Sequence, residues 1–226
     1  HGVRCYAQGL GETRSARHVL HQAQLLCDEA SHLEVVWRMY EYRFGYRLEP
    51  GLTLNQVRGR EGVRVRDAYA AEAERTGVQW EGRHYDQGHW DWADPLNRAL
   101  SAANACLNGI CHAGIVSGGY SPALGFVHTG RQLSFVYDIA DLYKTEITIP
   151  LAFETVAESE QEVETRVRLT CRDRFRENRL LSRILPDIDA LLAMPAGEAE
   201  EEARADATGE FGVHLWNRLW EEVQKE

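Results

Sequence analysis

The sequence lacks the patterns that define several large classes of protein. It has no run of about 18 apolar residues, so we expect no membrane-spanning helix. Its five cysteines are odd in number and include no C-x-x-C pair, which argues against a disulfide framework or a zinc site and favours reduced, mostly buried thiols in a cytoplasm. The G-x-S-x-G, P-loop and H-E-x-x-H motifs are missing as well, which excludes the enzyme classes that depend on them.

The start of the chain also lacks two common features. His1 is not an initiator Met, and the residues that follow do not have the basic and then apolar layout of a signal peptide. Residues 1–6 read instead as the end of a strand. We therefore expect the chain to be a fragment of a longer protein.

Lysine is nearly absent, because all but two of the 25 basic residues are arginine, the better bidentate ligand for phosphate. A net charge of −10 is unfavourable for binding nucleic acid, but most of this charge lies beyond residue 150. Local basic clusters matter more for phosphate binding than net charge does. An alternative is that these arginines belong to solvated helix faces paired with Glu. The two clusters are Arg58, Arg60, Arg64 and Arg66, and then Arg166, Arg168, Arg172, Arg174, Arg176, Arg179 and Arg183.

Apolar periodicity predicts a mainly α-helical chain. Glycines and an Asp-Pro pair set several of the boundaries, with Gly45 and Gly77 as helix ends and Asp94-Pro95 as a helix start. A helix rich in small residues follows Pro95 and should be central and buried. The predicted helices are residues 18–44, 53–75, 95–117, 133–145, 160–176 and 178–192.

Composition divides the end of the chain from the rest. Residues 195–210 are rich in Ala, Glu, Gly and Asp, which is typical of a flexible acidic linker. Residues 211–226 then form a predicted amphipathic helix with an apolar stripe that includes Trp216, Leu219 and Trp220. This stripe is expected to dock either on a partner or on the body of the chain itself.

Asp138 and Asp141 are candidate ligands for a cation. Three residues apart on a helix, they lie about 60° apart around its axis, and their neighbours are apolar. Two carboxylates at a buried surface repel each other unless a cation lies between them, and Mg²⁺ or Mn²⁺ prefers such oxygen ligands. The alternative is that Asp138 caps a neighbouring helix while Asp141 pairs with Lys144.

His128 and Glu61 are weaker candidates on residue chemistry alone. His128 lies on a loop bounded by Gly125 and Gly130, which can return it to the helix of the two aspartates, although a lone His is usually structural. Glu61 lies between two glycines in a predicted helix, where each Gly costs about 1 kcal/mol relative to Ala. Close packing against another helix explains those glycines as well as a bound phosphate does. Acidic ligands beside arginines are typical of phosphoryl transfer.

Three segments carry a resemblance to a known family. They are RGREGVRVR at residues 58–66, GYSPALGFVHTG at 119–130 and LSFVYDIAD at 133–141. They resemble the CRISPR-associated integrase of spacer acquisition, the Cas-one family, and in particular its type I-E branch. The resemblance extends from Val3 to about Leu192, and it leaves out the acidic linker and the terminal helix.

The resemblance implies a small N-terminal β-domain followed by an all-helical catalytic domain. Residues 1–12 would then be the end of the β-domain and residues 13–194 the helical domain. The implied ligands of Mg²⁺ or Mn²⁺ are Glu61, His128 and Asp141, with Asp138 as an auxiliary acidic residue. The implied DNA contacts are Arg4, Arg66, Tyr85, Trp90, Arg131, Lys144 and Arg168, of which the two aromatic residues would act by stacking.

The implied reaction is a transesterification. A DNA 3′-hydroxyl attacks a phosphodiester of the CRISPR repeat, which inserts captured foreign DNA into the array. The implied partners are double-stranded DNA with 3′-OH ends, repeat DNA, a second copy of the chain and the small second adaptation protein. Two alternatives stay open: a non-catalytic DNA-binding assembly subunit of the same complex, and a general nuclease of branched DNA.

Overall fold

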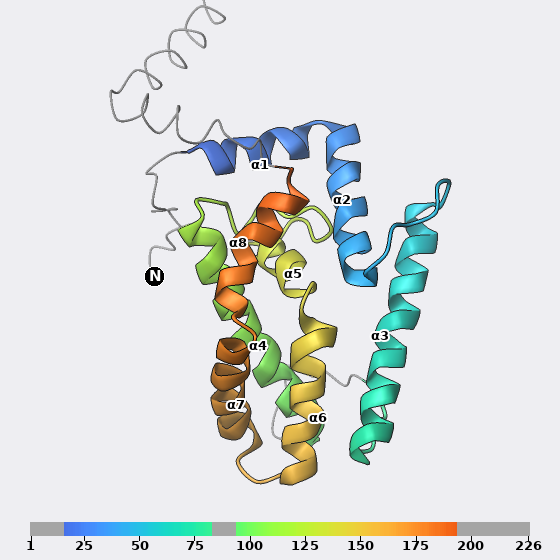
Figure 1. The fold of residues 1–226 in the computed structure, drawn as a ribbon, viewed down its shortest axis with the longest axis vertical. Helices are drawn as coiled ribbons and strands as arrows, with labels where there is room; N and C mark the ends of the chain where they lie inside the picture. The colour runs from blue at the N-terminus through green and yellow to red at the C-terminus, as the bar shows by residue number, and fades with distance from the viewer. Residues whose placement is uncertain (1–15, 83–93, 194–226) are drawn as a thin grey trace, which may run out of the picture.

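The computed structural model describes residues 16–82 and 94–193, and each regular element in these two ranges is a helix (Figure 1). This confirms the mainly α fold class. The predicted end of a β-domain, the acidic linker and the terminal helix lie outside the described residues. The elements are α1 (Arg17–Cys27), α2 (Glu29–Phe44), α3 (Leu54–Thr76), α4 (Pro95–Ser117), α5 (Ser134–Ala140), the π-helical turn η2 (Lys144–Thr148), α6 (Ile149–Glu158), α7 (Val163–Glu177) and α8 (Leu180–Leu191).

The long helix predicted for residues 18–44 is two helices, α1 and α2, with a break at Asp28. This residue adopts an extended backbone conformation (φ −96°, ψ 116°), and its side chain accepts a hydrogen bond from the backbone N–H of Ser31. Asp28 is therefore the N-cap of α2. The sequence prediction overlooked it because the apolar periodicity continues across the break. The predicted end of α2 at Gly45 is confirmed, with a left-handed φ of 74°.

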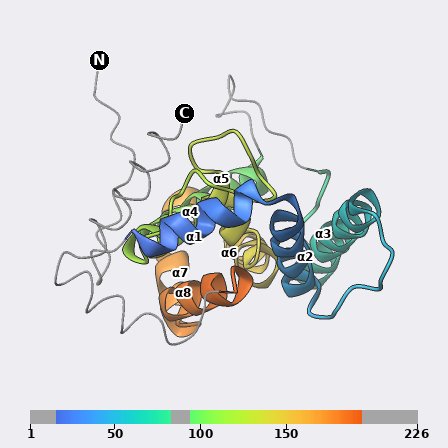
Figure 2. The same cartoon turned by 90° about the horizontal axis from the view of Figure 1, so that it is seen from above.

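Helix α3 begins and ends as the sequence predicts. Thr53 and Gln56 form a reciprocal capping box at its N-terminus, and Gly77 closes its C-terminus with a φ of 73°. In the two perpendicular views α3 lies at one edge of the molecule, beside α2 and α6 (Figures 1 and 2). This position leaves much of its surface exposed.

Helix α4 is the central helix of the fold. Asp94 caps it by accepting from the backbone N–H of Asn97, Pro95 occupies its first turn, and its small residues pack against α5, α6, α7 and α8. By length and average composition α4 is also apolar enough to cross a membrane, although the sequence contains no continuous apolar run. Its buried face, which includes Ala99, Ala103 and Leu107, instead packs inside the helical core.

The helix predicted for residues 133–145 is shorter than expected. α5 ends at Ala140, and Asp141 is its C-cap. After a turn, η2 leads directly into α6, which the sequence prediction missed. Pro150 lies in the first turn of α6, where a missing N–H costs nothing. The predicted helices 160–176 and 178–192 correspond to α7 and α8.

Candidate active site

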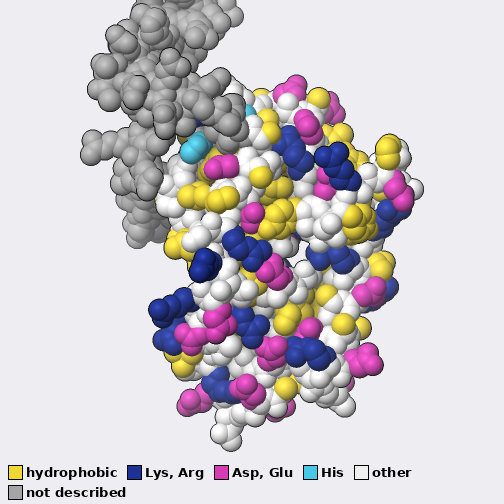
Figure 3. All heavy atoms as spheres, viewed as in Figure 1, with side chains coloured by type: hydrophobic (Ala, Val, Ile, Leu, Met, Phe, Trp, Pro, Cys, Tyr) yellow, Lys and Arg dark blue, Asp and Glu magenta, His cyan; other side chains and the backbone are white. Residues whose placement is uncertain are grey.

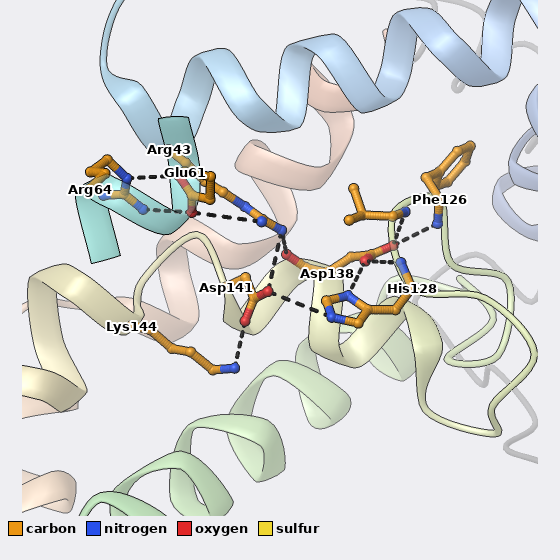
Figure 4. A network of polar contacts seen from close by, with 9 residues as sticks. Arg43, Glu61, Arg64, Phe126, His128, Asp138, Asp141 and Lys144 are labelled. Carbon is orange, nitrogen blue, oxygen red and sulfur yellow. Dashed lines mark hydrogen bonds and ion pairs between the residues drawn. The ribbon is translucent and has the colours of Figure 1, made fainter. Parts of the chain in front are cut away.

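The structure brings the four sequence-predicted site residues together from three parts of the fold (Figure 4). Glu61 lies on α3, Asp138 lies inside α5, and Asp141 is the C-cap of α5. His128 lies on the loop that joins α4 to α5. The C-terminal end of α2 contributes a fifth residue, Arg43, which contacts both Glu61 and Asp141.

Asp138 is fully buried and binds the loop that carries His128. One carboxylate oxygen accepts hydrogen bonds from the backbone N–H groups of Phe126 (2.6 Å) and Val127 (3.1 Å). The other oxygen accepts from the backbone N–H of His128 at 2.8 Å. Three consecutive N–H groups thus surround one carboxylate, which compensates for its burial and fixes the path of the loop.

This arrangement contradicts the prediction that the two aspartates point to one shared cation. The Asp138 carboxylate is directed at the loop, whereas that of Asp141 contacts Arg43, His128 and Lys144 (Figure 4). The alternative that Asp138 caps a helix is wrong as well, because its partners are loop residues. The alternative pairing of Asp141 with Lys144 is confirmed by a distance of 2.5 Å.

The imidazole of His128 is oriented by Asp138. Its Nδ1 lies 2.7 Å from Oδ1 of Asp138, and a carboxylate without a proton can only accept, so we assign the ring proton to Nδ1. The lone pair is then on Nε2, which faces Oδ2 of Asp141 at 3.8 Å. A carboxylate that accepts from one ring nitrogen while the other nitrogen is left for a ligand is the usual arrangement around a metal-binding His.

The loop that carries His128 depends on Gly125. A Cβ atom added there would lie 2.2 Å from the carbonyl oxygen of His128 and 2.7 Å from Ser134. Only a residue without a side chain allows the loop to approach the start of α5 this closely. The prediction that this loop brings His128 back to the helix of the two aspartates is confirmed, and the close approach is possible because position 125 has no side chain.

Glu61 is held by two arginines. Arg64 donates to both of its oxygens at 2.9 Å, and Nη1 of Arg43 lies 3.9 Å from Oε1. The two glycines beside Glu61 are Gly59 and Gly62. A Cβ atom at either position would meet nothing within 4 Å, so neither glycine permits close packing against another described helix.

Among residues 16–82 and 94–193, no three His, Cys, Asp or Glu side chains are placed so that they could hold a metal ion together. The guanidinium of Arg43 lies between Glu61 and Asp141, and Lys144 pairs with Asp141. By their chemistry, the side chains gathered here, two carboxylates and an imidazole, are nevertheless of the types that bind divalent cations. Two largely buried carboxylates converge on one cationic group, and the free Nε2 of His128 faces one of them.

The predicted DNA contacts divide into described and undescribed residues. Arg66, Arg131 and Arg168 are exposed, and Lys144 lies at the site itself. Arg4, Tyr85 and Trp90 lie outside the described residues. On the face drawn in Figure 3, basic and acidic side chains are interspersed. Several arginines of the second cluster form ion pairs with acidic residues, as the solvated-face alternative predicts; they are Arg166, Arg172, Arg174 and Arg183.

Arg43 is the site residue that the sequence analysis missed. Val36, Met39, Tyr40 and Arg43 occupy one apolar face of α2 at a spacing of three and four residues, and all four are buried. An arginine in line with three core residues, two positions before the helix-ending Gly45, is a signal for a buried cation with acidic partners.

Comparison with known proteins places the chain in a family. The family model described as CRISPR associated protein Cas1 matches residues 10–170. The CRISPR-associated endonuclease Cas1 2 of Thermus thermophilus is 56% identical over 218 residues, which are 95% of this chain and 66% of that protein. The CRISPR-associated endonuclease Cas1 of Escherichia coli is 45% identical over 89% of this chain and 66% of its own length. The chain thus spans slightly less than two thirds of these relatives.

Solved structures agree with the sequence comparison. A crystal structure of a TtCas1–DNA complex superimposes with a TM-score of 0.77 at 57% identity, over 87% of this chain and 70% of that one. A crystal structure of TtCas1 gives a TM-score of 0.75 at 56% identity, over 86% of this chain and 72% of that one. The family expected from the three sequence segments is thereby confirmed, and the chain belongs to the Cas1 family.

Proposed function

We propose that this chain carries the catalytic centre of a CRISPR adaptation integrase, a metal-dependent DNA endonuclease and strand transferase. The observation that supports it best is the convergence of Glu61, His128 and Asp141, with Asp138 fixing the His128 ring so that Nε2 is left for a ligand. The type I-E character remains part of the proposal. So do the cytoplasmic location and the partners, namely 3′-OH DNA, repeat DNA, a second copy of the chain and the small second adaptation protein.

The proposed reaction exchanges one phosphodiester for another. The 3′-oxygen of a captured DNA end forms a bond to phosphorus at the repeat, the existing bridging P–O bond breaks, and the displaced strand leaves as a hydroxyl. Glu61, His128 and Asp141 would hold Mg²⁺ or Mn²⁺, which when bound polarises the phosphate and stabilises the negative charge that develops there. No covalent enzyme intermediate is required, in keeping with the missing nucleophile motifs.

The protein's own residues have three tasks in this scheme. Asp138 keeps His128 in one tautomer and one orientation. Arg64 and Lys144, which neutralise the carboxylates in this structure, are partly exposed cations that can turn toward a DNA phosphate. Other residues are proposed to hold the DNA strands by contacts at a distance from the reacting atoms. They are the exposed Arg66, Arg131 and Arg168, together with Arg4, Tyr85 and Trp90.

The test is a strand-transfer assay. Purified protein with its small partner, a duplex with 3′-OH ends and a repeat-containing plasmid should yield joined product in Mg²⁺ or Mn²⁺ and none in EDTA. His128→Ala and Asp141→Ala should each abolish joining. His21→Ala, which removes a histidine of α1 that contacts the carbonyl of Leu192, is the matched control and should join normally. Unchanged joining by either site variant contradicts the proposal.

A second candidate function is a non-catalytic, DNA-binding assembly subunit. It is favoured by the ion pairs that Arg43, Arg64 and Lys144 form with the carboxylates of Glu61 and Asp141, because these cations can neutralise both carboxylates. Such a subunit would bind DNA equally well in EDTA and in Mn²⁺ and would join no strands in either. A general nuclease of branched DNA would instead cleave in the presence of metal and give no joined product.

A further inference from the structure

Arg43 is the most deeply buried cation at the site. Its side chain is 4% exposed. Nη1 lies 3.9 Å from Oε1 of Glu61, and Nη2 lies 3.5 Å from both Oδ2 of Asp141 and the backbone carbonyl oxygen of Asp138. The guanidinium carbon lies 5.3 Å from the centre of the Tyr40 ring, and Nε has no hydrogen-bond partner. One charge from α2 therefore connects a carboxylate of α3 with the C-terminal end of α5.

The other two cations at the site differ from Arg43 in exposure and in contact length. The side chains of Arg64 and Lys144 are 25% and 32% exposed. Each makes a short contact with a single carboxylate, Arg64 with Glu61 at 2.9 Å and Lys144 with Asp141 at 2.5 Å. Long side chains at the surface can exchange such a partner for water or for phosphate at low cost. The buried guanidinium of Arg43 cannot move into water without opening the core.

These differences determine what happens when a divalent cation binds. Arg43, Arg64 and Lys144 together contact the carboxylates of Glu61 and Asp141 in this structure. A divalent cation at Glu61 and Asp141 adds two positive charges, so some of the cations already present have to leave the carboxylates. Arg64 and Lys144 are able to leave, whereas Arg43 has to remain beside the metal ion and repel it.

We propose that Arg43 is a positioning residue and a permanent countercharge of the site. It holds Glu61 and Asp141 together in the metal-free protein and weakens metal binding, while Arg64 and Lys144 are the exchangeable cations. This inference rests on the proposed metal site. Under this proposal, Glu61 and Asp141 are in place before the metal ion binds, and the metal ion binds less tightly because the Arg43 charge repels it.

The test compares Arg43→Gln with the wild type by thermal unfolding and by calorimetric titration with Mn²⁺. In EDTA the variant should unfold at a lower temperature, because two largely buried carboxylates from different helices then lack their shared cation. Mn²⁺ should raise its unfolding temperature by more than it raises that of the wild type. The variant should also bind Mn²⁺ roughly tenfold more tightly, because the nearby repelling charge is gone.

Arg38→Gln is the matched control. Arg38 lies on the same helix and also has a buried Nε without a hydrogen-bond partner. Its other nitrogens contact the backbone carbonyl of Leu191 and the carboxylate of Glu34, and neither of these belongs to the site. This variant should lose stability equally in EDTA and in Mn²⁺. Arg43→Lys keeps the charge, so it should retain the wild-type Mn²⁺ affinity, and it provides the comparison in case Arg43→Gln does not fold.

The two proposals fail in different ways. A wild-type protein that shows no Mn²⁺ binding contradicts the metal site and, with it, the role of Arg43. A wild-type protein that binds Mn²⁺ while Arg43→Gln binds it equally or more weakly contradicts the role of Arg43 alone. Tighter Mn²⁺ binding by Arg43→Lys than by the wild type also contradicts that role.

Discussion

The Nδ1 atom of His128 lies 2.7 Å from Oδ1 of Asp138, and the backbone N–H of the same histidine donates to that same oxygen at 2.8 Å. One carboxylate oxygen therefore fixes both the backbone and the ring of His128. This double contact links the fold to the proposed chemistry, because the path of the loop and the orientation of the imidazole depend on a single buried side chain.

Replacement of Asp138 by Asn should impair both stability and metal binding. An amide offers one acceptor oxygen where the carboxylate offers two, so at least one backbone N–H of residues 126–128 loses its partner. We expect a loss of about 3 kcal/mol in the free energy of unfolding, measured by denaturant titration. Mn²⁺ affinity should also fall, because the His128 ring is no longer held in one tautomer.

Asp189→Asn is the control for that experiment. Asp189 accepts a hydrogen bond from the Tyr120 hydroxyl at 2.6 Å and lies on α8, outside the site. This variant should lose some stability and keep its Mn²⁺ affinity. Normal Mn²⁺ affinity in folded Asp138→Asn contradicts the orienting role of Asp138.

Gly125→Ala should distort the loop that carries His128. The added methyl group would lie 2.2 Å from a backbone carbonyl oxygen, which cannot move aside as a flexible side chain can. Overpacking of this kind costs about 1–3 kcal/mol, and the same shift should abolish strand transfer. Gly130→Ala, in the same loop, meets nothing within 4 Å and is strained only by its φ of 77°, so it should cost about 1 kcal/mol and reduce strand transfer less. Equal effects of the two substitutions would contradict this steric account.

Local signals in the sequence explain which parts of the fold were predictable. Gly45, Gly77 and Asp94-Pro95 define helix ends through their own backbone preferences, and the structure confirms each of them. The break at Asp28 and the start of α6 beside Pro150 were not predicted, because the effect of both residues depends on their position. An aspartate inside a periodic stretch can break the helix, and a proline ends one helix or begins the next.

The site was predictable in its members but not in their arrangement. The spacing of Asp138 and Asp141 suggested two carboxylates facing one cation. The actual direction of Asp138 depends on a loop whose three N–H groups need an acceptor, which no helical spacing reveals. Arg43 was missed because its partners are 18 and 98 residues away in the sequence, on α3 and at the end of α5.

Cys106 should react with thiol reagents near neutral pH. A hydrogen bond from Cys171 and, to a smaller extent, the nearby Arg168 guanidinium outweigh the effect of burial and lower the pKa of Cys106 to about 7. Since the thiolate is the nucleophile, alkylation by iodoacetamide should fall as the pH drops below 7 and level off above 8. The measurement is the labelling rate of each cysteine as a function of pH, determined by peptide mass spectrometry.

Cys171→Ala tests the cause of that shift. Without the donor, the pKa of Cys106 should rise toward the ordinary value of a thiol, and its labelling at pH 7 should slow by roughly tenfold. Cys27, which is exposed on α1, is the internal reference and should label at the same rate in both proteins. A Cys106 rate that is unaffected by Cys171→Ala contradicts the hydrogen bond as the cause.

Gly62→Ala should stabilise the protein and weaken its binding to DNA. Gly62 is exposed on α3 next to Glu61, and a Cβ atom there meets nothing within 4 Å. Alanine in a helix is favoured over glycine by about 1 kcal/mol, which thermal unfolding can detect. If a DNA backbone approaches this face, the methyl group should obstruct it, and the dissociation constant for a 3′-OH duplex should rise.

Gly109→Ala separates the two effects of that substitution. Gly109 is likewise an exposed helical glycine with nothing within 4 Å of an added Cβ, but it lies on α4. It should give the same gain in stability with no change in DNA binding. If Gly62→Ala also gains stability and binds DNA normally, no ligand approaches α3 at Gly62. The glycine beside Glu61 then has no role in DNA binding.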